Sequence, residues 1–281
     1  MNYRHAFHAG NFADVFKHVA LLGLLDALRA KPAPFCYVDT HAGRGIYDLR
    51  GDSAQRTGEF RDGVARVLQA GDLPPTLADY AQRIRAFGAD ADGDLMRYPG
   101  SPLLARDLLR ADDRAILCEL QDEEAAALRA ALHGDARCAV HERDGYAALK
   151  ALLPPAQKRG LVLIDPPFEA QGAEFEAIAQ ALTPALARWP NAIYAIWYPI
   201  KLRETITPFH RWLGSEVGKA DVLVTELLHP GNTPLRLNGC GLAILNPPWQ
   251  FDTWLATWLP NLARLLAAGS DPTTRIEWVR R

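Results

Sequence analysis

Residues 161–168 read Leu-Val-Leu-Ile-Asp-Pro-Pro-Phe, a short apolar run that ends in an acidic residue and two prolines. Such a run, bounded by turn-forming residues, is typical of a β-strand. Similar runs alternate along the chain with longer amphipathic stretches. The predicted strands are residues 35–39, 115–119, 138–141, 161–165, 192–198, 222–228 and 242–245.

The stretches between these strands predict crossover helices, because apolar residues recur in them at three- and four-residue spacing. The clearest helix candidates are residues 122–132, 145–153, 174–188 and 251–268. Strands that alternate with helices indicate an α/β fold, with a doubly wound, Rossmann-like sheet. We expect a mixed sheet of seven strands. In open sheets of this kind, ligands bind beyond the carboxyl ends of the strands, so functional residues are sought there.

One interval, residues 50–98, interrupts this alternation. It contains no convincing strand, whereas residues 59–69 and 77–87 are predicted helices on either side of a Gly- and Pro-containing turn at 71–75. A crossover between parallel strands needs only a dozen or so residues, and this one is several times longer. We therefore predict a small helical subdomain inserted into the chain.

The ends of the first three strands suggest a nucleoside-like ligand. Gly43 lies in the turn Asp39-Thr40-His41-Ala42-Gly43-Arg44-Gly45, where glycine permits close approach of the backbone to a ligand. Glu119 ends the second strand and could accept hydrogen bonds from ribose hydroxyls. Asp144, followed by Gly145, comes after the third strand and could accept an adenine amino group. Either carboxylate alone could equally be a helix cap or a solvated loop charge.

The fourth strand end carries the most specific chemistry. An exocyclic base amine is a poor nucleophile, because its lone pair is delocalised into the ring. Asp165 could accept one N–H of such an amine, and the carbonyl group of Pro166 could accept the other. Phe168 offers an aromatic face for stacking a base, worth about 1 to 3 kcal/mol. This segment therefore predicts methylation of an adenine N6.

A second, similar tetrapeptide, Asn246-Pro247-Pro248-Trp249, follows the last predicted strand. In methyltransferase sheets this strand runs antiparallel to its neighbours, so its end points away from the cofactor. We interpret the second tetrapeptide as structural.

Composition narrows the class of protein. The formal net charge of −2 excludes an overall basic coat, so nucleic acid must bind a local patch. The cysteines are scattered and predict reduced side chains rather than a metal site. No apolar run is long enough to span a membrane, and residues 1–10 contain no apolar core of a signal peptide. We expect a soluble, cytoplasmic monomer without a metal ion.

Several motifs together resemble the large-subunit ribosomal RNA methyltransferase J family. The N-terminal run Tyr3-Arg4-His5-Ala6-Phe7-His8-Ala9-Gly10-Asn11, with Ala13-Asp14 and Lys17-His18 after it, is highly specific. The others are Asp39-Thr40-His41-Ala42-Gly43, Tyr98-Pro99-Gly100-Ser101-Pro102 and Asp165-Pro166-Pro167-Phe168. They span most of the chain in the family's order.

This resemblance implies a class I methyltransferase fold that uses S-adenosylmethionine and acts on an adenine N6 in 23S rRNA. The methyltransferase domain would comprise residues 1–49 and 99–281, opening with a helix within 1–31, and 50–98 would be the inserted subdomain. Tyr3, His5 and Lys17 would join Asp165 and Phe168 at the target base. The residues around the cofactor would be His18, His41, Ser101, Glu119, Asp144, Gly145 and Asp165.

On its own pattern, Lys17 could instead be an exposed helix charge. RNA contacts could come from basic residues in and around the insertion and after the fifth strand, namely Arg44, Arg56, Arg61, Arg66, Lys201, Arg203 and Arg211. Each of these is more often a solvated surface charge.

Three alternative functions remain open at this point. A DNA adenine methyltransferase uses the same tetrapeptide. A nicotinamide-dependent oxidoreductase shares the glycine turn and the acidic second strand, but has no use for the segment from Asp165 to Phe168. A non-catalytic RNA-binding module is the third alternative, and the intact set of polar strand ends argues against it.

Overall fold

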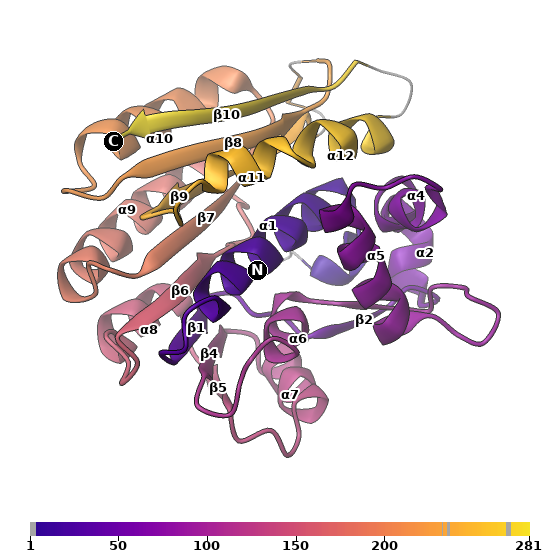
Figure 1. Ribbon diagram of the computed structural model, residues 1–281, viewed down its shortest axis with the longest axis horizontal. Coiled ribbons are helices and arrows are strands. Elements are labelled where there is room, and N and C mark those ends of the chain that lie inside the picture. The colour runs from indigo at the N-terminus through magenta and orange to yellow at the C-terminus, as the bar shows by residue number, and fades with distance from the viewer. Residues whose placement is uncertain (1–3, 232, 235–236, 268–270) are drawn as a thin grey trace.

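An eight-stranded sheet forms the centre of the protein, and helices cover both of its faces (Figure 1). The computed structural model describes residues 4–231, 233–234, 237–267 and 271–281. The strand order is β10-β8-β9-β7-β6-β1-β4-β5. The strands are β1 (Phe35–Asp39), β4 (Arg114–Glu119), β5 (Cys138–Glu142), β6 (Arg159–Ile164), β7 (Ile193–Ile200), β8 (Val222–Leu228), β9 (Gly239–Leu245) and β10 (Thr273–Arg280).

Strand direction confirms the predicted α/β arrangement. The strands β5, β4, β1, β6 and β7 pair in parallel, so their carboxyl ends meet at one edge of the sheet. Strand β9 lies between β7 and β8 and is antiparallel to both. The predicted antiparallel direction of this strand is therefore confirmed.

The predicted number of seven strands is wrong, because the sheet has an eighth strand at one edge. Strand β10 pairs antiparallel with β8. Its sequence, Thr-Thr-Arg-Ile-Glu-Trp-Val-Arg, mixes polar with apolar residues and contains no apolar run longer than two residues. Such a mixture suits an edge strand whose residues stay partly exposed, and it gives a weaker signal than a buried strand does.

The helices form two layers with separate apolar cores. The layer that contains α1, α6, α7, α11 and α12 packs on one face, and the layer of α8, α9 and α10 packs on the other. These helices are α1 (Phe12–Arg29), α6 (Ser101–Arg106), α7 (Asp122–Ala131), α8 (Gly145–Leu152), α9 (Gln171–Arg188), α10 (Arg203–Ser215), α11 (Phe251–Ala256) and α12 (Leu259–Leu266).

The long crossover after β1 is largely helical, as predicted, but it also contains two short strands. These are β2 (Ile46–Asp48) and β3 (Arg97–Pro99), which pair antiparallel. The intervening helices are α2 (Asp52–Thr57), α3 (Glu59–Asp62), α4 (Val64–Gln69) and α5 (Pro75–Gly88). A single helix over 59–69 is not formed, because the backbone of Gly63 is not helical (φ −109°, ψ −110°) and the N–H of Val64 donates to the carbonyl oxygen of Gly10 at 2.8 Å.

The inserted helices share the apolar core of α1 rather than forming one of their own. Val64, Val67 and Leu77 are fully buried in the same cluster as Phe16 of α1. The insertion therefore adds a layer over α1, and its treatment as a separate subdomain stays a proposal. No helix among the described residues is both long and apolar enough to cross a membrane.

Candidate active site

A cavity of about 1130 Å³ lies at the carboxyl ends of the parallel strands. It is bordered by the turn after β1, by the segments that follow β4, β5 and β6, and by the start of α1. Nearly all of the predicted site residues line it. Those lining it are His5, Lys17, His18, His41, Gly43, Ser101, Glu119, Asp144, Gly145, Asp165, Pro166 and Phe168. Tyr3 lies outside the described residues.

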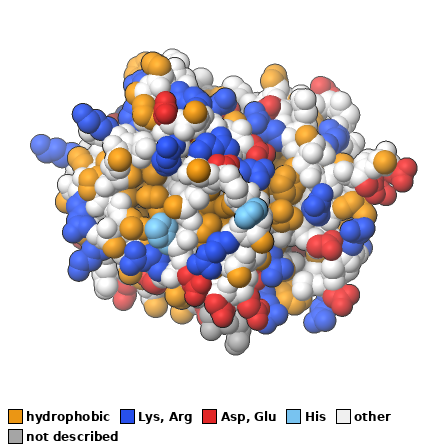
Figure 2. Space-filling view, turned by 90° about the horizontal axis from the view of Figure 1, so that it is seen from below, with side chains coloured by type: hydrophobic (Ala, Val, Ile, Leu, Met, Phe, Trp, Pro, Cys, Tyr) orange, Lys and Arg blue, Asp and Glu red, His pale blue; other side chains and the backbone are white. Residues whose placement is uncertain are grey.

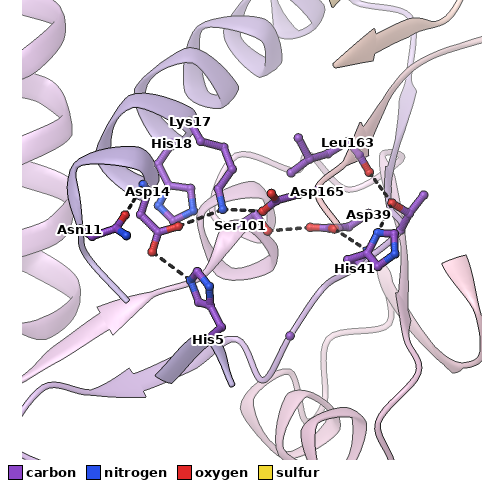
Figure 3. Close-up of polar contacts among 12 residues, drawn as sticks. His5, Asn11, Asp14, Lys17, His18, Asp39, His41, Ser101, Leu163 and Asp165 are labelled. Carbon is purple, nitrogen blue, oxygen red and sulfur yellow. Dashed lines mark hydrogen bonds and ion pairs between the residues drawn. The ribbon is translucent and has the colours of Figure 1, made fainter. Parts of the chain in front are cut away.

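The first turns of α1 bring three polar side chains to the cavity. Asn11 caps the helix by accepting a hydrogen bond from the backbone N–H of Asp14 at 2.9 Å. Residues three and four apart lie on the same helix face, so Asp14, Lys17 and His18 point in one direction (Figure 3). All three are buried. The alternative of an exposed helix charge is therefore excluded for Lys17.

Lys17 bridges two carboxylates. Its ammonium Nζ donates to Asp14 Oδ1 at 2.9 Å and to Asp165 Oδ2 at 2.5 Å (Figure 3). Burial disfavours the ammonium, but the charges of Asp14 and Asp165 outweigh it and hold the pKa of Lys17 well above its ordinary value. Burial likewise disfavours the Asp14 carboxylate, yet His5 and Lys17 hold its pKa well below the usual range. Lys17 and Asp14 therefore form an ion pair across the neutral pH range.

His18 belongs to a buried hydrogen-bonded chain that reaches into the insertion. Its Nδ1 lies 2.8 Å from the hydroxyl of Tyr98, which lies 2.9 Å from the hydroxyl of Tyr80. Either hydroxyl can be the donor in the second contact. We infer that Tyr80 donates to Tyr98 and Tyr98 donates to Nδ1, because in this order both hydroxyl protons have an acceptor among the described residues. The remaining proton is on Nε2. Burial lowers the pKa of His18 to about 3, so the ring is a neutral donor toward the cavity.

Asp39, at the end of β1, organises the turn that follows. Its Oδ2 accepts hydrogen bonds from the hydroxyls of Tyr37 and Ser101, each at 2.7 Å. Burial raises the pKa of Asp39 to about 6. Next along the chain, the Thr40 hydroxyl lies 2.8 Å from Nδ1 of His41. Burial lowers the pKa of His41 to about 4.

The two predicted nucleoside-binding carboxylates hold backbone groups in the structure. Glu119 accepts hydrogen bonds from the backbone N–H groups of Gly43 at 2.9 Å and Gln121 at 2.8 Å. Burial raises the pKa of Glu119. Asp144 caps α8 by accepting from the N–H of Ala147 at 2.7 Å. Each carboxylate keeps further acceptor capacity toward the cavity, because its oxygens carry more lone pairs than these contacts use.

The segment after β6 forms one wall of the cavity. Phe168 has a positive φ of 49°, and its ring packs edge-on against Phe175 and Trp197 at centroid distances of 5.4 and 5.8 Å. Positive φ is uncommon for a bulky residue and marks a turn whose shape is imposed by its surroundings. The two preceding prolines also line the cavity and stiffen the turn.

The second Pro-Pro tetrapeptide lies at the opposite edge of the sheet. The side-chain amide of Asn246 donates to the carbonyl oxygens of Pro190 and Ala192, each at 2.8 Å. These two residues precede β7, whereas Asp165 follows the parallel strand β6. Asn246 therefore ties the loop after β9 to the amino ends of the parallel strands.

The basic residues that were predicted to contact RNA occupy different surroundings. Arg44 makes two hydrogen bonds of 3.0 Å to Glu124, and Arg66 pairs with Asp62. Lys201 lines the cavity. On the face shown in Figure 2, Lys and Arg side chains are spread among acidic and apolar ones rather than forming a continuous basic coat.

Sequence reasoning assigned no role to Asp14, Tyr80 or Tyr98. Asp14 could have been found from its three- and four-residue spacing to Lys17 and His18. Tyr98 belongs to one of the motifs that resemble the family, but no local pattern predicted its contact with His18, because the two residues are 80 positions apart. Among the described residues, no group of three or more His, Cys, Asp or Glu side chains could hold a metal ion.

The sheet order, the antiparallel β9 and a cavity walled by Asp-Pro-Pro-Phe define a class I methyltransferase. Residues 32–280 match the family model described as "Ribosomal RNA large subunit methyltransferase D, RlmJ", and the chain belongs to this family.

Two relatives and one crystal structure resemble the whole chain. It is 39% identical over 281 residues to "Ribosomal RNA large subunit methyltransferase J" of Escherichia coli, with 99% of each chain covered. It is 36% identical over 280 residues to the Haemophilus influenzae protein of the same name, again with 99% of each covered. A crystal structure of a Legionella pneumophila protein superimposes with a TM-score of 0.88 at 35% identity, covering 96% of this chain and 98% of that one.

Burial of the two histidines predicts how stability depends on pH. The folded-state pKa values of His18 and His41, about 3 and 4, lie below the ordinary value of 6.5. Both side chains are neutral in the folded and unfolded states above pH 6.5. Below pH 6.5 the unfolded state binds protons that the folded state does not, so stability is lost as the pH falls. The raised pKa values of Asp39, about 6, and of Glu119 and His8 act in the opposite direction. The lowered pKa values of His141 and His210 act in the same direction as those of His18 and His41. We expect the free energy of unfolding to decrease between about pH 6.5 and pH 5.

The variant His18→Asn tests this prediction, because the amide oxygen can still accept from Tyr98. The variant should be less stable than the parent near neutral pH, and its pH dependence should be flatter by about 1.4 kcal/mol per pH unit. Urea unfolding at several pH values measures both slopes. Identical slopes would show that His18 is not held neutral.

Proposed function

We propose that this protein transfers the methyl group of S-adenosylmethionine to N6 of an adenine in 23S rRNA. The observation that carries the proposal is the ion pair of Lys17 and Asp165 at the end of β6, beside the Pro-Pro-Phe wall. Lys17 occupies one oxygen of Asp165, and no described residue donates to the other. That oxygen is available for an N–H of the target amine. The names of the two bacterial relatives support ribosomal RNA as the substrate.

The cavity lining suits a nucleoside that carries a positive charge. Acidic side chains outnumber Lys and Arg around the cavity, which favours a sulfonium ion over an anionic dinucleotide. Glu119 and Asp144 would accept from the ribose hydroxyls and the adenine amino group, and His18 would donate to the amino-acid portion. When bound, S-adenosylmethionine supplies an electrophilic methyl group.

The residues of this chain would orient the target amine. We infer that the adenine is extruded from its RNA context, at a cost of a few kcal/mol, and enters the cavity beside Phe168. Asp165 and the Pro166 carbonyl group would accept its two N–H groups and hold N6 in line for direct transfer. A carboxylate is too weak a base to remove the amine proton before attack. Asp165 therefore orients the amine and stabilises its developing positive charge, and the proton leaves after transfer.

Ligand-dependent melting tests the cofactor. S-adenosylhomocysteine should raise the melting temperature and NAD should not, because a ligand stabilises only the state that it binds. Labelled methyl groups should then appear in unmodified 23S rRNA and not in duplex DNA. Stabilisation by NAD alone would contradict the proposed cofactor, and transfer to duplex DNA alone would contradict the proposed substrate.

A further inference from the structure

Asp14 makes more hydrogen bonds than the start of helix α1 requires. Its side chain is 3% exposed and accepts three hydrogen bonds. Oδ2 accepts from His5 Nε2 at 2.9 Å and from the backbone N–H of Gly10 at 3.0 Å, while Oδ1 accepts from Lys17. The contact with Gly10 provides an acceptor for a backbone N–H just before helix α1. The other two contacts hold side chains that face the cavity.

The contact of Asp14 with Lys17 determines where the ammonium lies. A lysine side chain has four rotatable bonds, and its charged end is not directed by its own backbone. Nζ is held between a carboxylate oxygen of Asp14 on one side and a carboxylate oxygen of Asp165 on the other (Figure 3). Without Asp14, the ammonium could shift toward the second oxygen of Asp165 and compete with the target amine.

We propose that Asp14 is a positioning residue for methyl transfer, which acts by holding Lys17 against a single oxygen of Asp165. The proposal rests on the proposed function, because it concerns the availability of Asp165 to the adenine amine. Asp14 lines the cavity, but its carboxylate oxygens already accept from His5, Gly10 and Lys17. It acts through Lys17, and its contribution disappears when Lys17 is absent.

A second acid–base pair on the same helix provides a matched control. Asp26 accepts from Arg29 at 3.0 Å with the same three-residue spacing as Asp14 and Lys17. The side chains of Asp26 and Arg29 are 47% and 40% exposed, however, whereas those of Asp14 and Lys17 are 3% and 6% exposed. The substitution Asp26→Asn removes an equivalent charge from α1 without touching the cavity.

The test is a double-mutant cycle on the full-length enzyme, with Asp14→Asn, Lys17→Met and both together. The turnover number kcat is measured at saturating concentrations of S-adenosylmethionine and 23S rRNA. The affinity for S-adenosylhomocysteine is measured by calorimetry. We expect Asp14→Asn to lower kcat by about 10-fold to 100-fold, since small displacements at a reacting centre have effects of this size. S-adenosylhomocysteine affinity should change by less than about 3-fold, and the double variant should be no slower than Lys17→Met. Asp26→Asn should match the parent.

Several results would overturn the proposal. If the two single effects multiply in the double variant, Asp14 acts independently of Lys17. If Asp14→Asn lowers the melting temperature but leaves kcat unchanged, Asp14 only stabilises the start of α1. If Asp14→Asn does not fold, Asp14→Glu keeps the charge but displaces the carboxylate, and a kcat equal to that of the parent would contradict positioning. An inactive parent enzyme would instead contradict the proposed function, so the two failures are distinguishable.

Discussion

The substitution Asp165→Asn is expected to lower the rate of rRNA methylation by a factor on the order of 100 or more. The amide keeps one acceptor oxygen, but it loses the negative charge that offsets the charge developing on N6. It also removes one of the two ionic partners of Lys17, whose Nζ lies 2.5 Å from Asp165 Oδ2. The fold should survive, because the replacement is nearly isosteric and Lys17 keeps its contact with Asp14.

The substitution Asn246→Ala provides the comparison at the second Pro-Pro tetrapeptide. The loss of two hydrogen bonds, and the positive φ of 52° at this position, should reduce stability by about 1 to 3 kcal/mol. Methylation should nevertheless stay within a few-fold of the parent at a temperature where both proteins are folded, because the loop lies at the far edge of the sheet. The methylation rate of both variants is measured with labelled cofactor and unmodified 23S rRNA. Tolerance of Asp165→Asn, together with loss of activity in Asn246→Ala, would refute the site assignment.

The two tetrapeptides show what the sequence could predict. Both follow apolar runs, and chemistry alone would make both candidates. Strand order distinguishes them, because β9 runs antiparallel and directs Asn246 to the edge opposite Asp165. That distinction was available from the order of elements along the chain. The edge strand β10 was not, because its mixed polar and apolar residues give no buried run.

The family resemblance placed Lys17 near Asp165, but local sequence patterns alone did not predict the contacts that organise the site. Lys17 and Asp165 are 148 positions apart, and their meeting depends on how α1 packs beside the end of β6. The same holds for His18 and Tyr98, which meet only because β3 closes the insertion against α1. Local patterns predict which residues end a strand or begin a helix. They do not predict that a buried lysine will bridge the carboxylate of its own helix and one that follows a distant strand.

The substitution Gly145→Ala is expected to weaken cofactor binding strongly, because Gly145 packs closely against the backbone of the turn after β1. A β-carbon at Gly145 would lie 2.0 Å from the carbonyl oxygen of Thr40, and that oxygen belongs to backbone that cannot move aside alone. Gly145→Ala must therefore push α8 away from the turn after β1, which carries His41 and Gly43. We expect S-adenosylhomocysteine affinity to fall by at least about 10-fold and stability by about 1 to 3 kcal/mol.

The matched control for this variant is Gly172→Ala in the first turn of α9. No atom lies within 4 Å of a β-carbon built there. Alanine in a helix is favoured over glycine by up to about 1 kcal/mol, so this variant should be as stable as the parent or more so, with unchanged cofactor affinity. Calorimetric titration with S-adenosylhomocysteine and urea unfolding compare the two variants. If Gly145→Ala binds the ligand as tightly as Gly172→Ala does, then the close packing of α8 on the turn after β1 does not shape the cofactor site, and Gly145 has no part in binding.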